Sequence, residues 1–262
     1  MSELNLGPLT LTLEKNETYT VTDCATNAVE VTVPAEVNGI RVAKVADYAF
    51  EDCTLLASVT FEEKETDGVL DELGLEEIGD HAFMRCISLS RIVLPWRLDR
   101  VGWGCFHSCS ALREVECNPY TYFSGYAFAH CTALTKITPL HCISEGVFSH
   151  CMSLTYLPIA EGADTISEDA FEHCEALREI TIPACVTRIE ALAFRGCYDL
   201  KTAAFERTEC WYGSNSYRRE DVEIDVSDPA ENAHDLAWMD FDDGEIAWYR
   251  KTRASRSKKQ IV

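Results

Sequence analysis

The sequence predicts an α/β solenoid, a right-handed superhelix of stacked coils with a parallel β-sheet along its concave side and a cap at each end. A template of the form Ala-Phe-x-x-Cys recurs seven times, at Phe50, Phe83, Phe106, Phe128, Phe148, Phe171 and Phe194, with Cys105 and Val147 in place of Ala in two copies. The steps between these phenylalanines are 33, 23, 22, 20, 23 and 23 residues. Other apolar residues keep fixed distances from each Phe. A unit of about 23 residues is too short to bury them alone, so each unit must stack on its neighbours.

Each repeat divides into two predicted elements. The Ala-Phe-x-x-Cys segment, flanked by Gly, Asp and Glu, predicts a tight helical turn on one wall of the solenoid. A Leu three residues after each Cys begins a segment of alternating apolar and polar residues, which is typical of a short strand. Stacked repeats pair these strands into a parallel sheet, with neighbours about 4.8 Å apart. An apolar residue also stands five positions before each Phe, at Val45, Ile78, Val101, Phe123, Ile143, Ile166 and Ile189.

The consensus Ile-x-x-x-Ala-Phe-x-x-Cys-x-x-Leu-x-x-Ile-x-Ile-Pro resembles the leucine-rich repeat of BspA-like bacterial surface antigens, over nearly the whole chain. The segments Tyr19–Cys24 and Val29–Val42 are similar to the N-terminal coil of that family, where an Asn-Gly turn, here at Asn38 and Gly39, closes a small hairpin. The resemblance implies a leucine-rich repeat fold with protein-binding surfaces.

The C-terminal segments at Cys210–Tyr212, Val226–Ala230 and Ile246–Arg250 resemble the cap of the same family, which covers the last coil. Residues Arg250–Lys259 include six basic side chains and no acidic one, and we interpret this segment as a solvated tail. We divide one continuous domain into 1–44, an N-terminal cap with a first partial coil; 45–205, seven leucine-rich repeats; 206–249, a C-terminal cap; and 250–262, a basic tail.

The sequence departs from the template at three places. An acidic insertion occupies Glu62–Glu72, the coil before Phe148 has only 20 residues, and Pro139 falls in an inward-facing strand position. We expect a local bulge or kink at that short coil.

Composition restricts the partners. The chain has 23 Lys and Arg against 44 Asp and Glu, a net charge of −21, which argues against a nucleic-acid partner. Hydrophobic residues make up 47 %, enough for a sizeable core. No stretch approaches the roughly 18 apolar residues of a membrane span, so we expect no membrane insertion. The first residues lack a signal-peptide pattern, which fits a cytoplasmic protein, whereas the resemblance implies the cell surface or secretion.

Seven of the thirteen cysteines recur at one template position, so they predict a buried column whose thiols hydrogen-bond weakly to neighbouring backbone. We interpret this column as structural, in preference to a redox or metal role. It consists of Cys53, Cys86, Cys109, Cys131, Cys151, Cys174 and Cys197. The other six cysteines share no spacing: Cys24, Cys105, Cys117, Cys142, Cys185 and Cys210.

Three histidines, His130, His150 and His173, precede the column cysteine in successive repeats and therefore predict a row of imidazoles on one wall. Such a row could bridge a cation pairwise or respond to pH, but a closed zinc site needs tetrahedral ligands. We interpret the row as polar residues of a solvated turn. Cys105–Cys109 falls on core template positions, and Asp240–Gly244 lacks the spacing of a calcium loop. We therefore predict no metal site.

No catalytic motif is found: the sequence has no Gly-x-Ser-x-Gly elbow, phosphate-binding loop, His-Glu-x-x-His or dinucleotide-binding glycine pattern. We therefore predict no catalytic residues, no cofactor and no enzymatic activity.

The outward strand positions define a candidate surface on the predicted concave face. Two basic and three acidic side chains give it a net charge of −1, which suits a protein ligand. These positions are Ser58, Thr60, Arg91, Val93, Glu114, Glu116, Lys136, Thr138, Tyr156, Pro158, Glu179, Thr181, Thr202 and Ala204. We select Arg91, Glu114, Glu116, Lys136, Tyr156, Glu179 and Thr181 as the candidate ligand-binding residues.

The prediction for function is a monomeric, non-enzymatic module that binds an unidentified protein. The resemblance implies an adhesin-like or surface-antigen-like role. The alternative is an intracellular leucine-rich repeat scaffold, with which reduced thiols agree. A metal-dependent enzyme that uses the histidine row is a remote alternative.

Overall fold

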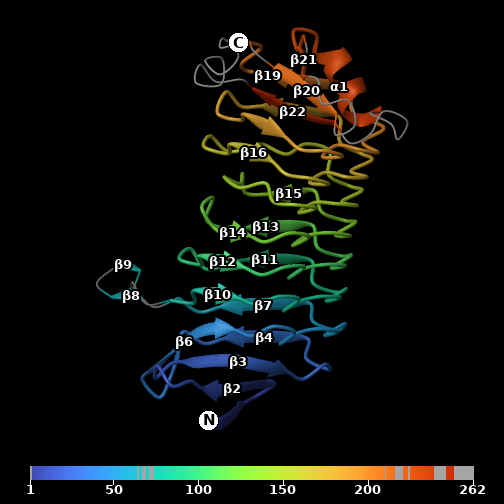
Figure 1. Ribbon diagram of the computed structural model, residues 1–262. Helices are drawn as coiled ribbons and strands as arrows, with labels where there is room; N and C mark the ends of the chain where they lie inside the picture. Colours follow the sequence, from blue (N-terminus) through green and yellow to red (C-terminus); the bar gives the residue numbers. More distant parts are fainter. Residues whose placement is uncertain are drawn as a thin grey trace.

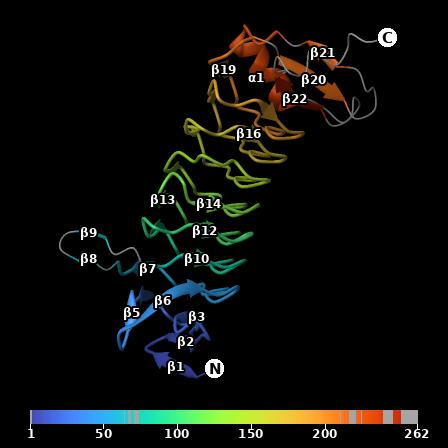
Figure 2. The ribbon, with the colours of Figure 1, turned by 60° about the vertical axis from the view of Figure 1, so that its left-hand side comes forward.

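The structure of the chain, a computed structural model, is a solenoid whose coils stack from the N-terminus to the C-terminus (Figure 1). It describes residues 2–63, 65–66, 69–70, 74–209, 211–215, 221–223, 225–238 and 246–250. Figure 2 shows the coils from the side, stacked in the order of the sequence. Within this part of the chain, no helix is long and apolar enough to cross a membrane.

The first coil is covered by an antiparallel meander and a hairpin. β1 pairs with β2, and β2 with β3, so the meander covers the apolar end of the stack. Asn38 and Gly39 both have positive φ, 53° and 78°, as the Asn-Gly hairpin turn requires. The elements are β1 (Glu3–Leu6), β2 (Leu9–Leu13), β3 (Tyr19–Cys24), β4 (Glu30–Val33), β5 (Glu36–Val37) and β6 (Ile40–Val45).

Most coils contribute two strands, so the solenoid has two parallel ladders where the sequence pattern predicted one. The coil of Phe148 contributes only single bridges. The leading ladder begins with β3 and continues with the strands that precede six of the seven Ala-Phe turns: β6, β10 (Glu77–Ile78), β12 (Arg100–Val101), β14 (Tyr122–Phe123), β16 (Thr165–Ile166) and β18 (Arg188–Ile189). It carries the apolar residue five positions before each Phe. From β10 onward these strands are only two residues long, which is too short for an alternating pattern to be visible in the sequence.

The trailing ladder is the predicted sheet. It begins with β4 and continues with the strands after six of the seven repeat Leu residues, while Leu154 is followed only by the single bridge Tyr156–Glu179. It consists of β4, β7 (Ser58–Phe61), β11 (Arg91–Val93), β13 (Glu114–Glu116), β15 (Lys136–Ile137), β17 (Glu179–Ile182) and β19 (Thr202–Phe205). The pairing is parallel and follows the repeat register, as in Ile92 opposite Val115 and Ile180 opposite Ala203.

The Ala-Phe-x-x-Cys segments form turns, which corrects the prediction of helical turns. The Cys N–H donates to the Phe carbonyl three residues earlier, for example Cys86 to Phe83 at 3.2 Å. Two residues in each of these turns have positive φ, such as Arg85 at 60°. This geometry turns alternate N–H groups toward the next coil, where Phe83 N–H meets the Cys105 carbonyl at 2.8 Å. The hydrogen bonds therefore run between coils, and helix is confined, within the described residues, to α1 (Pro229–Trp238).

The seven repeat phenylalanines form one continuous stack in the core, as the template predicts. Consecutive rings lie 4.5 to 5.8 Å apart between centroids and are nearly parallel. All seven are at most 1 % exposed. Stacking of identical rings thus joins every coil to the next through the middle of the molecule.

Strand pairing is interrupted at the 20-residue coil, which is the form that the expected irregularity takes. Parallel pairing stops at β14 and β15 and resumes with single bridges at Ile143–Ile166 and Leu140–Ile159. Pro139 is half-buried, and the fully buried Leu140 takes the inward position that the template gave to Pro139. Proline has no N–H to donate to a ladder, which accounts for the break.

The acidic insertion contains the two-residue strands β8 (Glu65–Thr66) and β9 (Val69–Leu70), which pair antiparallel. Both views place them beside the stack of coils, projecting from its side (Figures 1 and 2).

The last coil is covered by α1 and an antiparallel group of strands, β20 (Trp211–Asn215), β21 (Asp221–Glu223) and β22 (Ile246–Arg250). β22 pairs with β18, and β20 pairs with both β22 and β21. Trp211 and Trp248 are each 1 % exposed and lie 5.0 and 5.9 Å from the Phe205 ring. Cys210, the Asp240–Gly244 segment and residues 251–262 of the basic tail lie outside the described residues.

Candidate interaction surface

The outward side chains of the trailing ladder lie where the alternation predicts. All fourteen predicted outward residues are exposed or half-buried, while the inward residues between them, such as Ile92 and Val115, are buried. We call the seven selected residues the trailing face: Arg91, Glu114, Glu116, Lys136, Tyr156, Glu179 and Thr181. The structure divides them into two groups.

Four residues of the trailing face form one network of ion pairs. The Arg91 guanidinium contacts Glu114 at 3.2 Å and Glu116 at 2.7 Å, and the Lys136 ammonium contacts the other oxygen of Glu114. The register of the trailing strands brings these side chains together, because Arg91, Glu114 and Lys136 are direct neighbours on β11, β13 and β15. Hydrogen bonding to Lys136, with Arg91 also close, lowers the pKa of Glu114 below its usual range.

The other group surrounds Tyr156. Its side chain is 46 % exposed, and its backbone is paired in parallel with Glu179 on β17, two residues before Thr181. Lys136 belongs to the preceding coil, but strand pairing is interrupted between β15 and Tyr156. The structure therefore joins Tyr156 to Glu179 through the backbone and does not join it to Lys136 in the same way.

A groove that the sequence reasoning missed lies at one end of the trailing face. It has a volume of ≈ 500 Å³ and lies between β7 and β11, where the ladder is unpaired. Its lining includes Ser58, Thr60, Glu63, Arg91 and Val93. The 33-residue step between the first two repeats is the only signal of this irregularity in the sequence.

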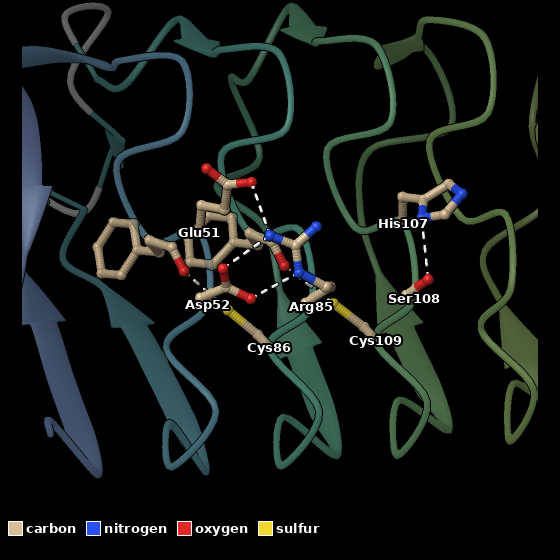
Figure 3. Close-up of polar contacts among 9 residues, drawn as sticks. Glu51, Asp52, Arg85, Cys86, His107, Ser108 and Cys109 are labelled. Carbon is tan, nitrogen blue, oxygen red and sulfur yellow. Dashed lines mark hydrogen bonds and ion pairs between the residues drawn. The ribbon is translucent and has the colours of Figure 1, made fainter. Parts of the chain in front are cut away.

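The stacked Ala-Phe-x-x-Cys turns form another wall of the solenoid, which we call the turn wall. It carries a second charged cluster, shown in Figure 3. The Arg85 guanidinium donates to the Asp52 carboxylate at 2.6 and 2.7 Å and to Glu51 at 2.9 Å. The hydrogen bond from Arg85 lowers the pKa of Asp52. These contacts link two consecutive coils across an exposed surface, so their contribution to stability is modest.

The predicted cysteine column is present. Six of the seven thiols donate to the carbonyl of the Phe in the preceding repeat, as with Cys86 to Phe50 at 3.2 Å and Cys109 to Phe83 at 3.1 Å (Figure 3). Cys53, in the first repeat, donates to the Cys24 carbonyl at 3.7 Å. Burial raises the pKa of Cys131 well above its ordinary value. Since the thiolate is the reactive form, buried thiols with raised pKa values are poor nucleophiles and poor metal ligands. All cysteines in the described part are free, and only Cys142 and Cys185 are partly exposed.

The histidine row is longer than predicted, because His107 of the preceding repeat extends it. His107 stands two residues before its column cysteine, whereas the other three histidines stand directly before theirs. Ring centroids lie 5.1 Å apart from His107 to His130, 4.4 Å from His130 to His150 and 4.8 Å from His150 to His173. The pKa values of His107 and His150 are lowered, mainly by burial and to a smaller extent by the neighbouring imidazoles. Among the described residues, no group of three or more His, Cys, Asp or Glu is arranged to hold a metal ion.

Comparison with known structures places this fold beside other leucine-rich repeat proteins. A leucine-rich cell surface protein from Faecalibacterium prausnitzii matches 87 % of this chain at 27 % identity, with a TM-score of 0.67. Leucine-rich repeat proteins from Bacteroides ovatus (24 % identity over 69 % of this chain, TM-score 0.58) and Treponema pallidum (23 % over 76 %, TM-score 0.51) share the fold. The matches cover 62 %, 44 % and 91 % of those three chains. A search of curated proteins found no significant match.

The repeat region itself matches the family described as the BspA type leucine-rich repeat region. Six copies are found over residues 19–141 and 138–222. These residues include both ladders, the phenylalanine stack and the cysteine column. The chain therefore belongs to the BspA type leucine-rich repeat family.

Proposed function

We propose that the chain is a non-enzymatic protein-interaction module and that its ligand docks on the trailing face, with Tyr156 as the anchor. The observation that carries this proposal is the exposure of Tyr156, 46 %, near the middle of a ladder whose neighbouring side chains are charged. Tyrosine is enriched among the residues that dominate binding energy at the centre of interfaces.

The charged network supports the same proposal. Arg91, Glu114, Glu116 and Lys136 already satisfy one another, so a ligand meets a fixed pattern of charges. Interface charges of this kind contribute more to selectivity and to association rate than to affinity. The trailing face would thus select a partner with complementary charges, while Tyr156 supplies the affinity.

We infer an adhesin-like or surface-antigen-like role. The cell surface location in the name of the similar Faecalibacterium prausnitzii protein supports this, as does the BspA type leucine-rich repeat family to which the chain belongs. An intracellular scaffold is the second candidate. Free thiols throughout the described part support it, since cytosolic proteins keep their cysteines reduced.

The test begins with capture of partners on the immobilised full chain, from host matrix proteins and, separately, from a bacterial lysate. The affinity of a captured protein is then measured for the wild type, Tyr156→Ala and a deletion of residues 62–72. We expect Tyr156→Ala to cost about 2 kcal/mol or more of binding free energy without changing the unfolding midpoint. The deletion should leave the affinity unchanged.

Tyr198→Ala is the matched control. Tyr198 is exposed to a similar degree, 53 %, but it directly follows Cys197 of the last turn and is not part of the trailing face. Unchanged affinity in Tyr156→Ala with lost affinity in the deletion would assign binding to the insertion and contradict the proposal.

A further inference from the structure

A second surface feature lies on the loops that connect the trailing strands to the leading strands. Two large aromatic side chains are exposed there in successive coils, Trp96 at 55 % and Tyr120 at 75 %. Beside them is a hollow of ≈ 460 Å³, which we call the loop hollow. The residues of its lining that matter here are Gly74, Glu76, Trp96, Arg97, Asp99 and Tyr120.

Hydrogen bonds and stacking hold the loops that carry the two aromatic side chains. The Tyr120 ring stacks on His141, with centroids 4.2 Å apart and planes at 12°. The Asn118 side chain joins the two loops, because its amide donates to the Trp96 carbonyl at 2.8 Å and its oxygen accepts from Tyr120 N–H at 3.0 Å. The backbone N–H of Trp96 donates to the Glu63 carboxylate at 2.9 Å. Fixed loops reduce the entropy lost when a ligand binds.

The charges of the loop hollow come close to cancelling. Glu76 is held by the Arg41 guanidinium at 2.7 Å, so its charge is already balanced. Arg97 and Asp99 carry opposite charges. A hollow of this kind offers no net field to attract a strongly charged ligand. A neutral ligand with hydrogen-bonding groups therefore suits it better than a cation or a polyanion.

We propose that the loop hollow binds a neutral saccharide. One face of a pyranose ring presents C–H groups, which pack against the electron-rich faces of aromatic rings such as Trp96 and Tyr120. Its hydroxyls are both donors and acceptors, and the Asp99 carboxylate and the Arg97 guanidinium supply partners of both kinds. The volume lies near the lower end of the range for small-molecule sites, which suits one or two sugar rings. This site is separate from the trailing face and does not depend on the proposed protein ligand.

The full chain is titrated calorimetrically with neutral oligomers of glucose, mannose, galactose and N-acetylglucosamine. A heparin oligosaccharide, a polylysine peptide and a proline-rich peptide are titrated in parallel. We expect one or more neutral oligomers to bind. Trp96→Ala and Tyr120→Ala should each weaken that binding at least about ten-fold, as loss of a central aromatic contact does. Tyr120→Phe, which keeps the ring, should bind like the wild type.

Tyr156→Ala is the control on the trailing face and should leave saccharide binding unchanged, so the two proposed sites are tested separately. Both aromatic side chains are largely exposed, so the alanine variants should keep the wild-type unfolding midpoint. The proposal is overturned if no neutral oligomer binds at millimolar concentration or if binding persists in both alanine variants. Binding of only the heparin oligosaccharide or one of the peptides would overturn it equally.

Discussion

At the scale of single residues, every repeat contributes a Phe ring and a Cys thiol that act on the neighbouring coils. Inside the stack, each ring lies between the rings of the neighbouring coils, and in six of the seven repeats the thiol donates to the carbonyl of the preceding Phe. Phe128, for example, lies 5.4 Å from Phe106 and 5.8 Å from Phe148, and Cys151 donates to the Phe128 carbonyl at 3.2 Å. Interactions between coils, more than those inside a coil, therefore stabilise the solenoid.

We predict that Phe128→Ala lowers the free energy of unfolding by about 3 to 5 kcal/mol, because neighbouring coils cannot close the cavity. Phe128 has no exposed surface and sits in the middle of the stack. Urea denaturation monitored by circular dichroism measures the change, with Tyr156→Ala as an exposed aromatic control. A midpoint equal to that of the wild type would contradict the role of the stack.

We predict that the protein loses stability at alkaline pH because its buried thiols resist ionisation. Burial raises the pKa of Cys131, Cys151 and Cys174 well above 9.0, the ordinary value for the thiol. Above about pH 9 the unfolded chain releases thiol protons that the folded chain retains, so ionisation favours unfolding. The stabilisation is therefore complete below pH 9 and is lost progressively as the pH rises.

Urea midpoints measured between pH 8 and pH 10.5 test this, with Cys131→Ala as the comparison. The variant is less stable at every pH because it lacks a buried side chain, but its stability should fall less steeply above pH 9. Parallel pH profiles for the two proteins would show that the column thiol does not titrate as expected.

At the scale of elements, strands of two to four residues are stable here because they occur in ladders. The turn wall adds a third series of hydrogen bonds between coils, in which residues of positive φ direct N–H groups outward from one coil to the next. At the end of this series Gly196 N–H donates to the Ala237 carbonyl of α1 at 3.3 Å. The helix thus pairs with the last turn in place of a further coil.

Asn232 of α1 fastens this helix to the solenoid, and its replacement tests the arrangement. The side chain is 2 % exposed, and its amide donates to the Ala203 carbonyl of β19 at 3.0 Å and to the Val226 carbonyl at 3.1 Å. We predict that Asn232→Ala costs about 1 to 3 kcal/mol, since two buried carbonyls lose their donor. Thermal unfolding measures the loss, and Glu231→Ala, an exposed neighbour, should change little. Equal melting temperatures for Asn232→Ala and the wild type would refute this role of Asn232.

At the scale of the whole molecule, the solenoid is a linear stack whose two ends are covered differently. An antiparallel meander covers the N-terminal coil, and α1 with three strands covers the other end. The ends need cover because the phenylalanine stack and both ladders would otherwise stop at exposed apolar surface and unpaired strand edges.

Truncation after Arg207 tests the importance of the C-terminal cover. It removes Trp211, Trp248, β22 and α1, which exposes Phe205 and leaves β18 paired on one edge only, with β16. We expect the truncated chain to aggregate. Size-exclusion chromatography with light scattering decides the question, because a soluble, monomeric product would mean that the C-terminal segment is dispensable.

Much of this architecture could be predicted from the sequence because a solenoid repeats one environment seven times. The Phe and Cys positions that Phe128 and Cys131 occupy recur in every repeat, so the burial of these residues and the columns they form follow from the periodicity. The outward position of Tyr156 follows from strand alternation. The number of coils, the trailing ladder and the phenylalanine and cysteine columns were therefore determined by the sequence itself.

The tertiary structure decided the features that do not recur. The ion-pair network around Glu114 depends on side chains from three coils, and the groove beside Arg91 depends on strands that fail to pair. The loop hollow arises because residues 22 to 24 positions apart, such as Trp96 and Tyr120, are brought together only by stacking. A repeated sequence pattern is enough to predict the fold, because every repeat has the same environment. A binding site consists of side chains that differ between repeats, and these side chains come together only when the coils stack.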